Sequence, residues 1–225
     1  MKKIIIPLIC FAQMTFAQTG LWMNAGLGKK WSKLQRSQFD IGYRQNLGLG
    51  FDRIYLDASH QVSIYDGISI QGAYRLALNE KGDQIRLRTD LLSHRVQIGF
   101  KISVLDLLDL GPKRLTLNWA SIQQWGMQAN QTTSSIWRNK LSIAYDLKNF
   151  PLSPCLSAEH FYRWNASVVY TPNDVIVTGA TTQWRYFFGA AVELPKNQEL
   201  KLQFGLRNRA NGTQSLARIS YSYQF

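Results

Sequence analysis

Apolar and polar residues alternate strictly in the last stretch of the chain. The odd positions from 217 onward carry Ala217, Ile219, Tyr221, Tyr223 and Phe225. The even positions between them are polar: Arg218, Ser220, Ser222 and Gln224. Successive side chains of a β-strand point to opposite faces. The pattern therefore predicts a strand with one apolar, aromatic face and one polar face.

The same alternation recurs upstream, separated by turn signals. It is clearest in five segments: 53–64, 95–102, 136–147, 183–194 and 198–209. Asp66-Gly67 lies between two such runs and is a strong signal for a two-residue hairpin. Further breaks fall at 79–83, 109–113, 129–135, 149–154, 171–179, 195–198 and 211–212. Strands joined in this way predict an all-β, antiparallel fold.

The N-terminus has the features of an export signal. Two lysines precede an apolar run at 4–16, and Ala17 follows in a setting that suits signal peptidase. The run is too short to span a bilayer as a helix. We predict a signal peptide over 1–17, cleaved between Ala17 and Gln18, and one domain over 18–225.

The C-terminus carries a second signal. An alternating final strand that contains Tyr221 and Tyr223 and ends in Phe225 is the known address read by the assembly machinery of bacterial outer-membrane barrels. Together with the export signal, it predicts a transmembrane β-barrel in the cell outer membrane. Strands that cross a bilayer at a tilt need about nine to eleven residues, which the predicted runs reach.

Aromatic residues near the strand ends favour the membrane barrel over a soluble sandwich or lipocalin, whose strands also alternate. Interfacial girdles of this kind flank the apolar band of outer-membrane barrels. The residues expected in the girdles are Trp22, Trp31, Trp125, Trp137, Trp164, Trp184 and Tyr223.

The runs predict about twelve strands. They lie near 20–31, 35–46, 50–65, 68–78, 84–92, 94–104, 113–127, 135–148, 154–166, 180–194, 198–209 and 213–225. The alternation loses its phase around 91–93, where a tight turn, a bulge or an extracellular loop would explain it. Without a strand at 84–92 eleven remain, whereas closed single-chain bacterial barrels normally have an even number. We therefore expect twelve strands, with ten as the alternative.

Composition and charge narrow the partners. The chain has 225 residues, of which 45% are hydrophobic, which is too few for a bundle of membrane helices. Loss of Lys2 and Lys3 lowers the formal net charge from +12 to +10 (12 − 2). A basic exported protein suits anionic lipid or an anionic ligand. The basic residues are spread singly, so we expect no nucleic-acid partner. After cleavage Cys155 is the one remaining cysteine, which excludes an internal disulfide.

Several short motifs resemble one group of proteins. They are Trp22 before a strand with Arg44, Gly72-Ala73-Tyr74-Arg75, His94-Arg95, Trp137-Arg138, the segment at 154–161, Trp184-Arg185-Tyr186 and the terminal Phe225. In order and spacing, over most of the chain, they resemble the uncharacterised outer-membrane proteins called domain of unknown function 2490. Segment 113–125 departs from the pattern, with Asn118 and Gln123 where charged residues are expected. The resemblance implies the location and the fold and little about mechanism.

The polar faces of the predicted strands should line the lumen, because a charge facing lipid at the midplane costs about 2–4 kcal/mol. The expected lumen arginines are Arg44, Arg53, Arg75, Arg95, Arg114, Arg138, Arg163, Arg185, Arg207, Arg209 and Arg218. The expected lumen carboxylates are Asp40, Asp57, Asp146, Glu159, Glu193 and Glu199.

This inventory supports three hypotheses. In the first, arginine forks pair with carboxylates and fill the lumen, as in many small barrels. In the second, the excess of arginines lines a small anion-selective pore for acidic solutes. In the third, a Ser–His pair at the lipid-facing rim modifies lipid. The first is favoured, and no enzyme is expected.

The Ser–His candidates lack the geometry of a catalytic pair. Ser59 adjoins His60 and Ser93 adjoins His94, and adjacent strand residues face opposite sides. Ser157 and Glu159 share a face that His160 does not. No metal-ligand spacing and no phosphate-binding glycine loop is visible, so no cofactor is predicted. The expected partners are outer-membrane lipid and lipopolysaccharide, the barrel-assembly machinery and an anionic solute.

Overall fold

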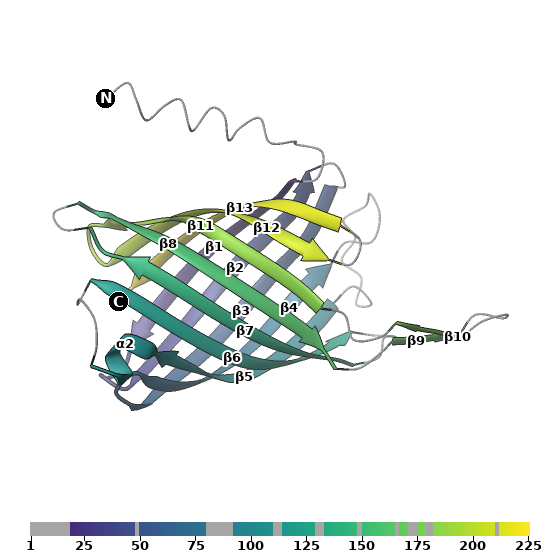
Figure 1. The fold of residues 1–225 in the computed structure, drawn as a ribbon, viewed down its shortest axis with the longest axis horizontal. Helices are drawn as coiled ribbons and strands as arrows, with labels where there is room; N and C mark the ends of the chain where they lie inside the picture. Colours follow the sequence, from purple (N-terminus) through teal and green to yellow (C-terminus); the bar gives the residue numbers. More distant parts are fainter. Residues whose placement is uncertain are drawn as a thin grey trace, which may run out of the picture.

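The chain folds into a closed β-barrel (Figure 1). The computed structural model describes residues 19–47, 50–79, 92–109, 114–128, 133–147, 150–164, 167–170, 175–178, 182–209 and 212–225. The barrel strands are β1 (Thr19–Lys30), β2 (Gln35–Leu47), β3 (Gly50–Tyr65), β4 (Ile68–Asn79), β5 (Leu92–Ser103), β6 (Leu115–Gln128), β7 (Ser134–Tyr145), β8 (Leu152–Arg163), β11 (Thr182–Leu194), β12 (Gln198–Arg209) and β13 (Gly212–Gln224). A short helix, α2 (Val104–Leu107), follows β5. The hairpin β9 (Ser167–Tyr170) and β10 (Val175–Thr178) forms a separate two-stranded sheet between β8 and β11 in the chain.

The predicted fold class is confirmed, but the strand count differs. Within the described residues the wall has eleven strands, in the order β1-β13-β12-β11-β8-β7-β6-β5-β4-β3-β2. The twelfth strand expected at 84–92 lies, except for Leu92, outside the described residues. β4 pairs directly with β5, from Ile68 opposite Ile102 to Leu78 opposite Leu92, so the wall has no place for a strand between them.

An odd number of strands closes because the last pair is parallel. Along an antiparallel chain of eleven strands, the first and the last run in the same direction. β1 and β13 therefore meet as a parallel pair, from Thr19 opposite Ser215 to Gly28 opposite Gln224. Parallel pairing is slightly less stable per residue than antiparallel pairing, but it satisfies the backbone of both edges. The expectation of an even number was wrong because it assumed antiparallel closure.

The hairpin predicted at Asp66-Gly67 is confirmed. β3 ends at Tyr65 and β4 begins at Ile68, and Gly67 has a φ of 78° that few other residues adopt. This turn lies at the barrel end where β13 finishes, which we call the C-terminal end. β1 begins at the opposite end.

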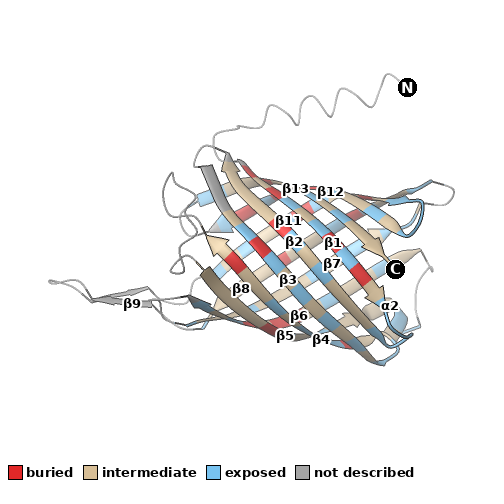
Figure 2. Cartoon of the chain, turned by 180° about the vertical axis from the view of Figure 1, so that it is seen from behind, coloured by how far each residue is buried: buried red, intermediate tan, exposed pale blue. Residues whose placement is uncertain are grey.

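Apolar side chains cover the outside of the wall and polar ones face the lumen. Buried positions alternate with exposed ones along the strands (Figure 2). On the outer face, Ile54, Leu202 and Phe204 are 39%, 46% and 58% exposed. Their sequence neighbours Arg53, Gln203 and Gly205 face inward. No helix among the described residues is long and apolar enough to cross a membrane.

Six of the seven expected girdle aromatics do lie on the outer face, and one does not. Trp31, Trp125, Trp137, Trp164 and Trp184 are exposed, and Tyr223 stacks on Phe225 at the end of the wall. Trp22 is 4% exposed and faces the lumen. Its parity decides this: Trp22 shares a face with Asn24 and the inward glycines of β1, whereas Leu21 and Met23 face outward.

Candidate functional site: an arginine and aromatic layer in the lumen

A layer of charged and aromatic side chains crosses the middle of the lumen. Its residues come from nine of the eleven strands of the described wall, all except β5 and β6, and each occupies an inward position of its strand. The layer consists of Trp22, Arg44, Tyr55, Arg75, Arg138, Lys140, Glu159, Phe161, Arg185, Phe187, Arg207, Leu216 and Arg218.

Glu159 on β8 lies at the centre of one half of this layer, where its carboxylate faces several cations. The register sets it directly opposite Lys140 of β7 on one side and Arg185 of β11 on the other. Arg138 Nη2 donates to Glu159 Oε1 at 2.7 Å. Lys140 Nζ lies 3.7 Å from the same oxygen, and Arg185 Nη1 lies 3.9 Å from Oε2. One carboxylate, 1% exposed, thus faces three cations.

Trp22 on β1 has the equivalent central position in the other half. The guanidinium carbons of Arg44, Arg185 and Arg207 lie 4.3, 5.1 and 5.9 Å from its ring centroid. The Phe187 ring packs against Trp22 at 6.0 Å between centroids. The electron-rich ring face attracts a guanidinium, and more strongly where water is excluded. Aromatic ring faces therefore contact arginines here in addition to the carboxylate of Glu159.

Arg75 combines the two kinds of contact. Its Nε donates to Asp57 Oδ1 at 3.0 Å, and its Nη2 bonds the second carboxylate oxygen, as a two-pronged pair. The same guanidinium lies 4.1 Å from the ring centroid of Tyr55. The Tyr55 hydroxyl donates to Asn24 Oδ1 on β1, which ties the layer to the parallel seam.

These contacts bury several side chains inside the lumen. Glu159, Phe187, Leu216 and Trp22 are between 1% and 4% exposed. Water has almost no access to side chains buried to that degree. Side chains of non-adjacent strands, such as Trp22 of β1 and Arg185 of β11, are therefore packed against each other at this level of the lumen.

Two polar cavities of about 370 Å³ each lie between the layer and the C-terminal end of the barrel. They share Arg36 and Gln38 in their linings. Carboxylates line the first, among them Asp40 and Asp57, whereas the charged residues lining the second are all basic: Arg36, Lys101, Arg138 and Lys140. The second cavity is therefore a basic chamber inside the barrel.

The predicted lumen residues are distributed unevenly. Arg44, Arg75, Arg138, Glu159, Arg185, Arg207 and Arg218 belong to the layer. Arg53, Arg95 and Arg163 also occupy inward positions, opposite Arg44, Arg75 and Ile136 respectively.

Four other expected lumen positions are at or beyond the ends of the strands. Arg114 precedes β6, and Asp146 follows β7 and is exposed. Glu193 and Glu199 face each other at the exposed ends of β11 and β12. The side chain of Arg209 and the cleavage residues Ala17 and Gln18 lie outside what the structure describes.

The inward aromatics Trp22, Tyr55, Phe161 and Phe187 were missed by sequence reasoning. Three of them have the same parity as charged neighbours: Tyr55 lies between Arg53 and Asp57, Phe161 follows Glu159 by two positions, and Phe187 follows Arg185 by two. Trp22 has the parity of Asn24. That parity was the available signal. We expected the polar faces of the strands to line the lumen, and the inward rings lie there beside arginines, whose guanidinium groups their faces attract.

The three histidines, His60, His94 and His160, lie on the outer face of the wall. His160 packs on Trp184, and His94 Nδ1 hydrogen-bonds the Tyr74 hydroxyl at 2.6 Å. Ser59 and His60 do face opposite sides. His60 Nδ1 instead lies 2.9 Å from Ser37 Oγ on β2, a pair that requires the β2–β3 register and is invisible in the sequence. Across the described residues, no cluster of His, Cys, Asp and Glu could hold a metal ion.

Comparison with known proteins identifies the fold and no family. No protein-family model and no curated protein matches the chain. Among solved structures it resembles the NanC porin, with 9% identity, coverage of 87% of each chain and a TM-score of 0.50. It also resembles the translocator domain of autotransporter NalP from Neisseria meningitidis, with 12% identity, coverage of 84% of this chain and 73% of that one, and a TM-score of 0.49. The likeness to NanC shows an outer-membrane type of barrel. The resemblance to domain of unknown function 2490 stays a prediction.

Proposed function

We propose that the protein is an integral outer-membrane β-barrel whose lumen is sealed, and that it acts as a membrane-embedded scaffold and not as an open pore. The observation that carries this proposal is the burial of the layer, in which Glu159, Trp22 and Phe187 are almost fully buried. A membrane location agrees with the apolar outer face, since charges there would be costly. Export by a signal peptide over 1–17, and membership of the domain of unknown function 2490 group, belong to the same proposal.

The seal predicts that the wild-type barrel does not conduct. In planar bilayers, the refolded protein should give no sustained current steps. Trp22→Ser combined with Phe187→Ser removes both rings from the layer and should open a conducting path. Trp22→Phe combined with Phe187→Leu keeps most of the apolar volume at the same positions and serves as the closed control. Sustained steps from the folded wild-type barrel would contradict the sealed lumen.

A second candidate, a narrow path for anions, is favoured by one specific observation. Arginines face arginines directly in the register: Arg44 opposite Arg53, Arg75 opposite Arg95, and Arg185 opposite Arg207. Like charges at this spacing repel each other and attract an anion. In a KCl gradient, the reversal potential of the opened variant should therefore report chloride preference, weakened by Arg138→Ser or Arg185→Ser. Cation preference would remove this candidate.

Catalysis is not part of the proposal. The Ser37 hydroxyl is within hydrogen-bond distance of His60, but among the described residues no carboxylate lies beside the histidine to orient it. Catalytic Ser–His pairs depend on such a third group. Hydrolysis of phospholipid that is lost in His60→Ala would overturn this part of the proposal. The assembly machinery, lipopolysaccharide and an anionic solute are the partners that we propose.

A further inference from the structure

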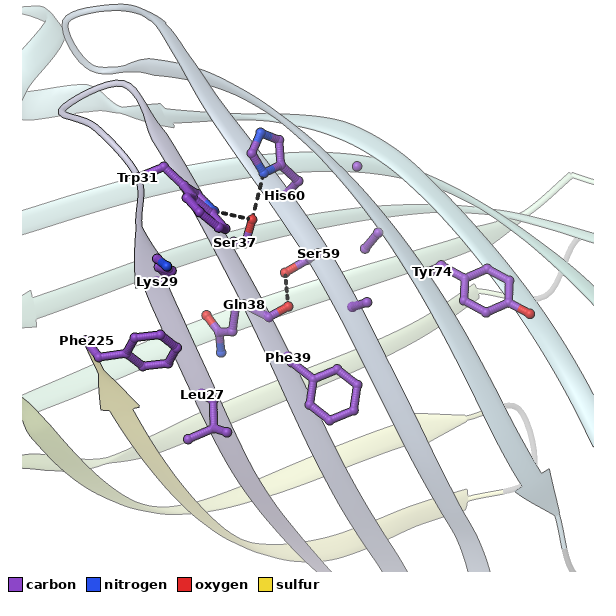
Figure 3. A pocket seen from close by; sticks show the side chains of 13 residues that line it. Leu27, Lys29, Trp31, Ser37, Gln38, Phe39, Ser59, His60, Tyr74 and Phe225 are labelled. Carbon is purple, nitrogen blue, oxygen red and sulfur yellow. Dashed lines mark hydrogen bonds between the residues drawn. The ribbon is translucent and has the colours of Figure 1, made fainter.

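A groove of about 820 Å³ runs along the outer face of β1–β4, near the C-terminal end of the barrel (Figure 3). Leu27, Phe39 and Tyr74 form its sides, and its floor includes the small residues Ala58 and Gly72. A methyl group placed on Gly72 would have no atom within 4 Å, so the floor is open space. Large apolar side chains such as Ile54, Leu202 and Phe204 occupy many other outward positions of the wall. The groove therefore has the lining and depth to take an apolar chain.

One end of the groove is polar and basic. Lys29 Nζ lies 4.1 Å from the Trp31 ring centroid and 5.7 Å from that of Phe225. Among the described residues, no carboxylate forms an ion pair with it. Interfacial tryptophan and lysine mark the headgroup level of a bilayer, where a lysine stem lies along apolar surface and its ammonium reaches the polar region. In the proposed membrane location, the Lys29 cation would lie at the level of lipid phosphates.

A chain of hydrogen bonds extends this polar end. Trp31 Nε1 donates to Ser37 Oγ at 2.9 Å, and Ser37 Oγ lies 2.9 Å from His60 Nδ1. Since Ser37 already accepts from Trp31, its own hydrogen is available to His60 Nδ1, and in that arrangement the ring proton lies on Nε2. Figure 3 shows Trp31, Ser37 and His60 at the same end of the groove as Lys29. With that tautomer, His60 Nε2–H is a second donor at the same end of the groove as the Lys29 ammonium.

We propose that this groove is a binding site for one glycerophospholipid with an anionic headgroup. An acyl chain would lie over Ala58 and Gly72, and the phosphate would meet Lys29 and His60. The charge of the lipid complements a cation that has no acidic partner in the described wall, and one apolar chain matches one apolar groove. The proposal rests on the membrane location proposed above and is independent of whether the lumen conducts.

Native mass spectrometry of the refolded barrel tests the site. The protein is exposed to mixed micelles with equal amounts of phosphatidylglycerol and phosphatidylcholine and is then stripped of loosely held lipid. The wild-type barrel should retain one phosphatidylglycerol. Lys29→Gln should reduce the preference for phosphatidylglycerol about fivefold, the effect of one basic residue near anionic lipid. Gly72→Leu fills the floor and should abolish retention of both lipids.

Matched variants separate the groove from the rest of the outer face. Ala190→Leu adds the same kind of side chain on β11, across the barrel, and should retain lipid as the wild type does. Lys33→Gln removes one positive charge in the exposed turn after β1 and should keep the preference. If Gly72→Leu does not fold, as judged by heat-modifiable migration, Ala58→Leu fills the same floor from β3.

Three results would overturn the proposal. One is a wild-type barrel that retains no lipid, or detergent alone. The second is equal retention in Gly72→Leu and Ala190→Leu. The third is a lipid preference that Lys29→Gln leaves unchanged. None of these results bears on the sealed lumen, which the conductance experiment decides separately.

Discussion

Glu159 and Trp22 hold arginines in the same layer of the lumen by different means. Glu159 supplies a negative charge that faces Arg138, Lys140 and Arg185 at 2.7–3.9 Å. Trp22 supplies a neutral ring face to arginines at 4.3–5.9 Å. Arg185 contacts both. The lumen holds more guanidinium groups than carboxylates. The difference shows how such a lumen can still be packed, because neutral ring faces attract the arginines where carboxylates are too few.

The largest expected effect comes from removing the charge of Glu159. Glu159→Gln keeps the shape but leaves three cations facing no carboxylate. Breaking a buried ion pair by removing one partner costs about 3–5 kcal/mol. Guanidinium unfolding of the refolded barrel in micelles should therefore show a large drop in the free energy of unfolding. Glu199→Gln, at an exposed inward position near the strand end, should change it by less than about 0.5 kcal/mol. Equal effects of the two variants would refute the central position of Glu159.

Removing the ring of Trp22 should have a smaller effect that depends on ring chemistry. Trp22→Leu keeps an apolar side chain but loses the face that three arginines contact, whereas Trp22→Phe keeps a ring. Cation–π contacts shielded from water contribute up to about 2 kcal/mol. We expect Trp22→Leu to be about 1–2 kcal/mol less stable than Trp22→Phe in the same unfolding experiment. Equal stability of the two would mean that Trp22 fills volume and does not hold the arginines.

The strands of the wall can be predicted from the sequence because their pattern depends only on residues close together in the chain. Lipid outside and polar groups inside impose a period of two on every strand. Eleven of the twelve predicted runs agree with the observed strands to within a few residues; the run at 198–209, for example, is β12 (Gln198–Arg209). The run at 84–92 lies, except for Leu92, outside the described residues. The hairpin at Asp66-Gly67 is equally local, since it depends on a glycine with positive φ.

Features that join distant strands could not be predicted in this way. Glu159 meets Lys140 and Arg185 through the register of three strands, and Ser37 meets His60 in the same manner. The parallel seam depends on how many strands the closed wall contains, which no single run reveals. Trp22 was misplaced because aromatic residues near strand ends were all assigned to the girdles, although its parity already set it with Asn24 on the inner face.

Arg75 allows the two kinds of contact to be compared at one residue, since its guanidinium contacts both the carboxylate of Asp57 and the ring of Tyr55. Arg75→Lys keeps the positive charge near Asp57 but loses the two-pronged contact and the flat stacking on Tyr55. We expect a loss of about 1 kcal/mol, smaller than for Glu159→Gln because the charge remains. Arg163 is the last residue of β8, and the free energy of unfolding of Arg163→Lys should stay within about 0.5 kcal/mol of the wild-type value. If Arg75→Lys is as stable as Arg163→Lys, charge alone holds this part of the layer, and the rings would then contribute packing and not attraction.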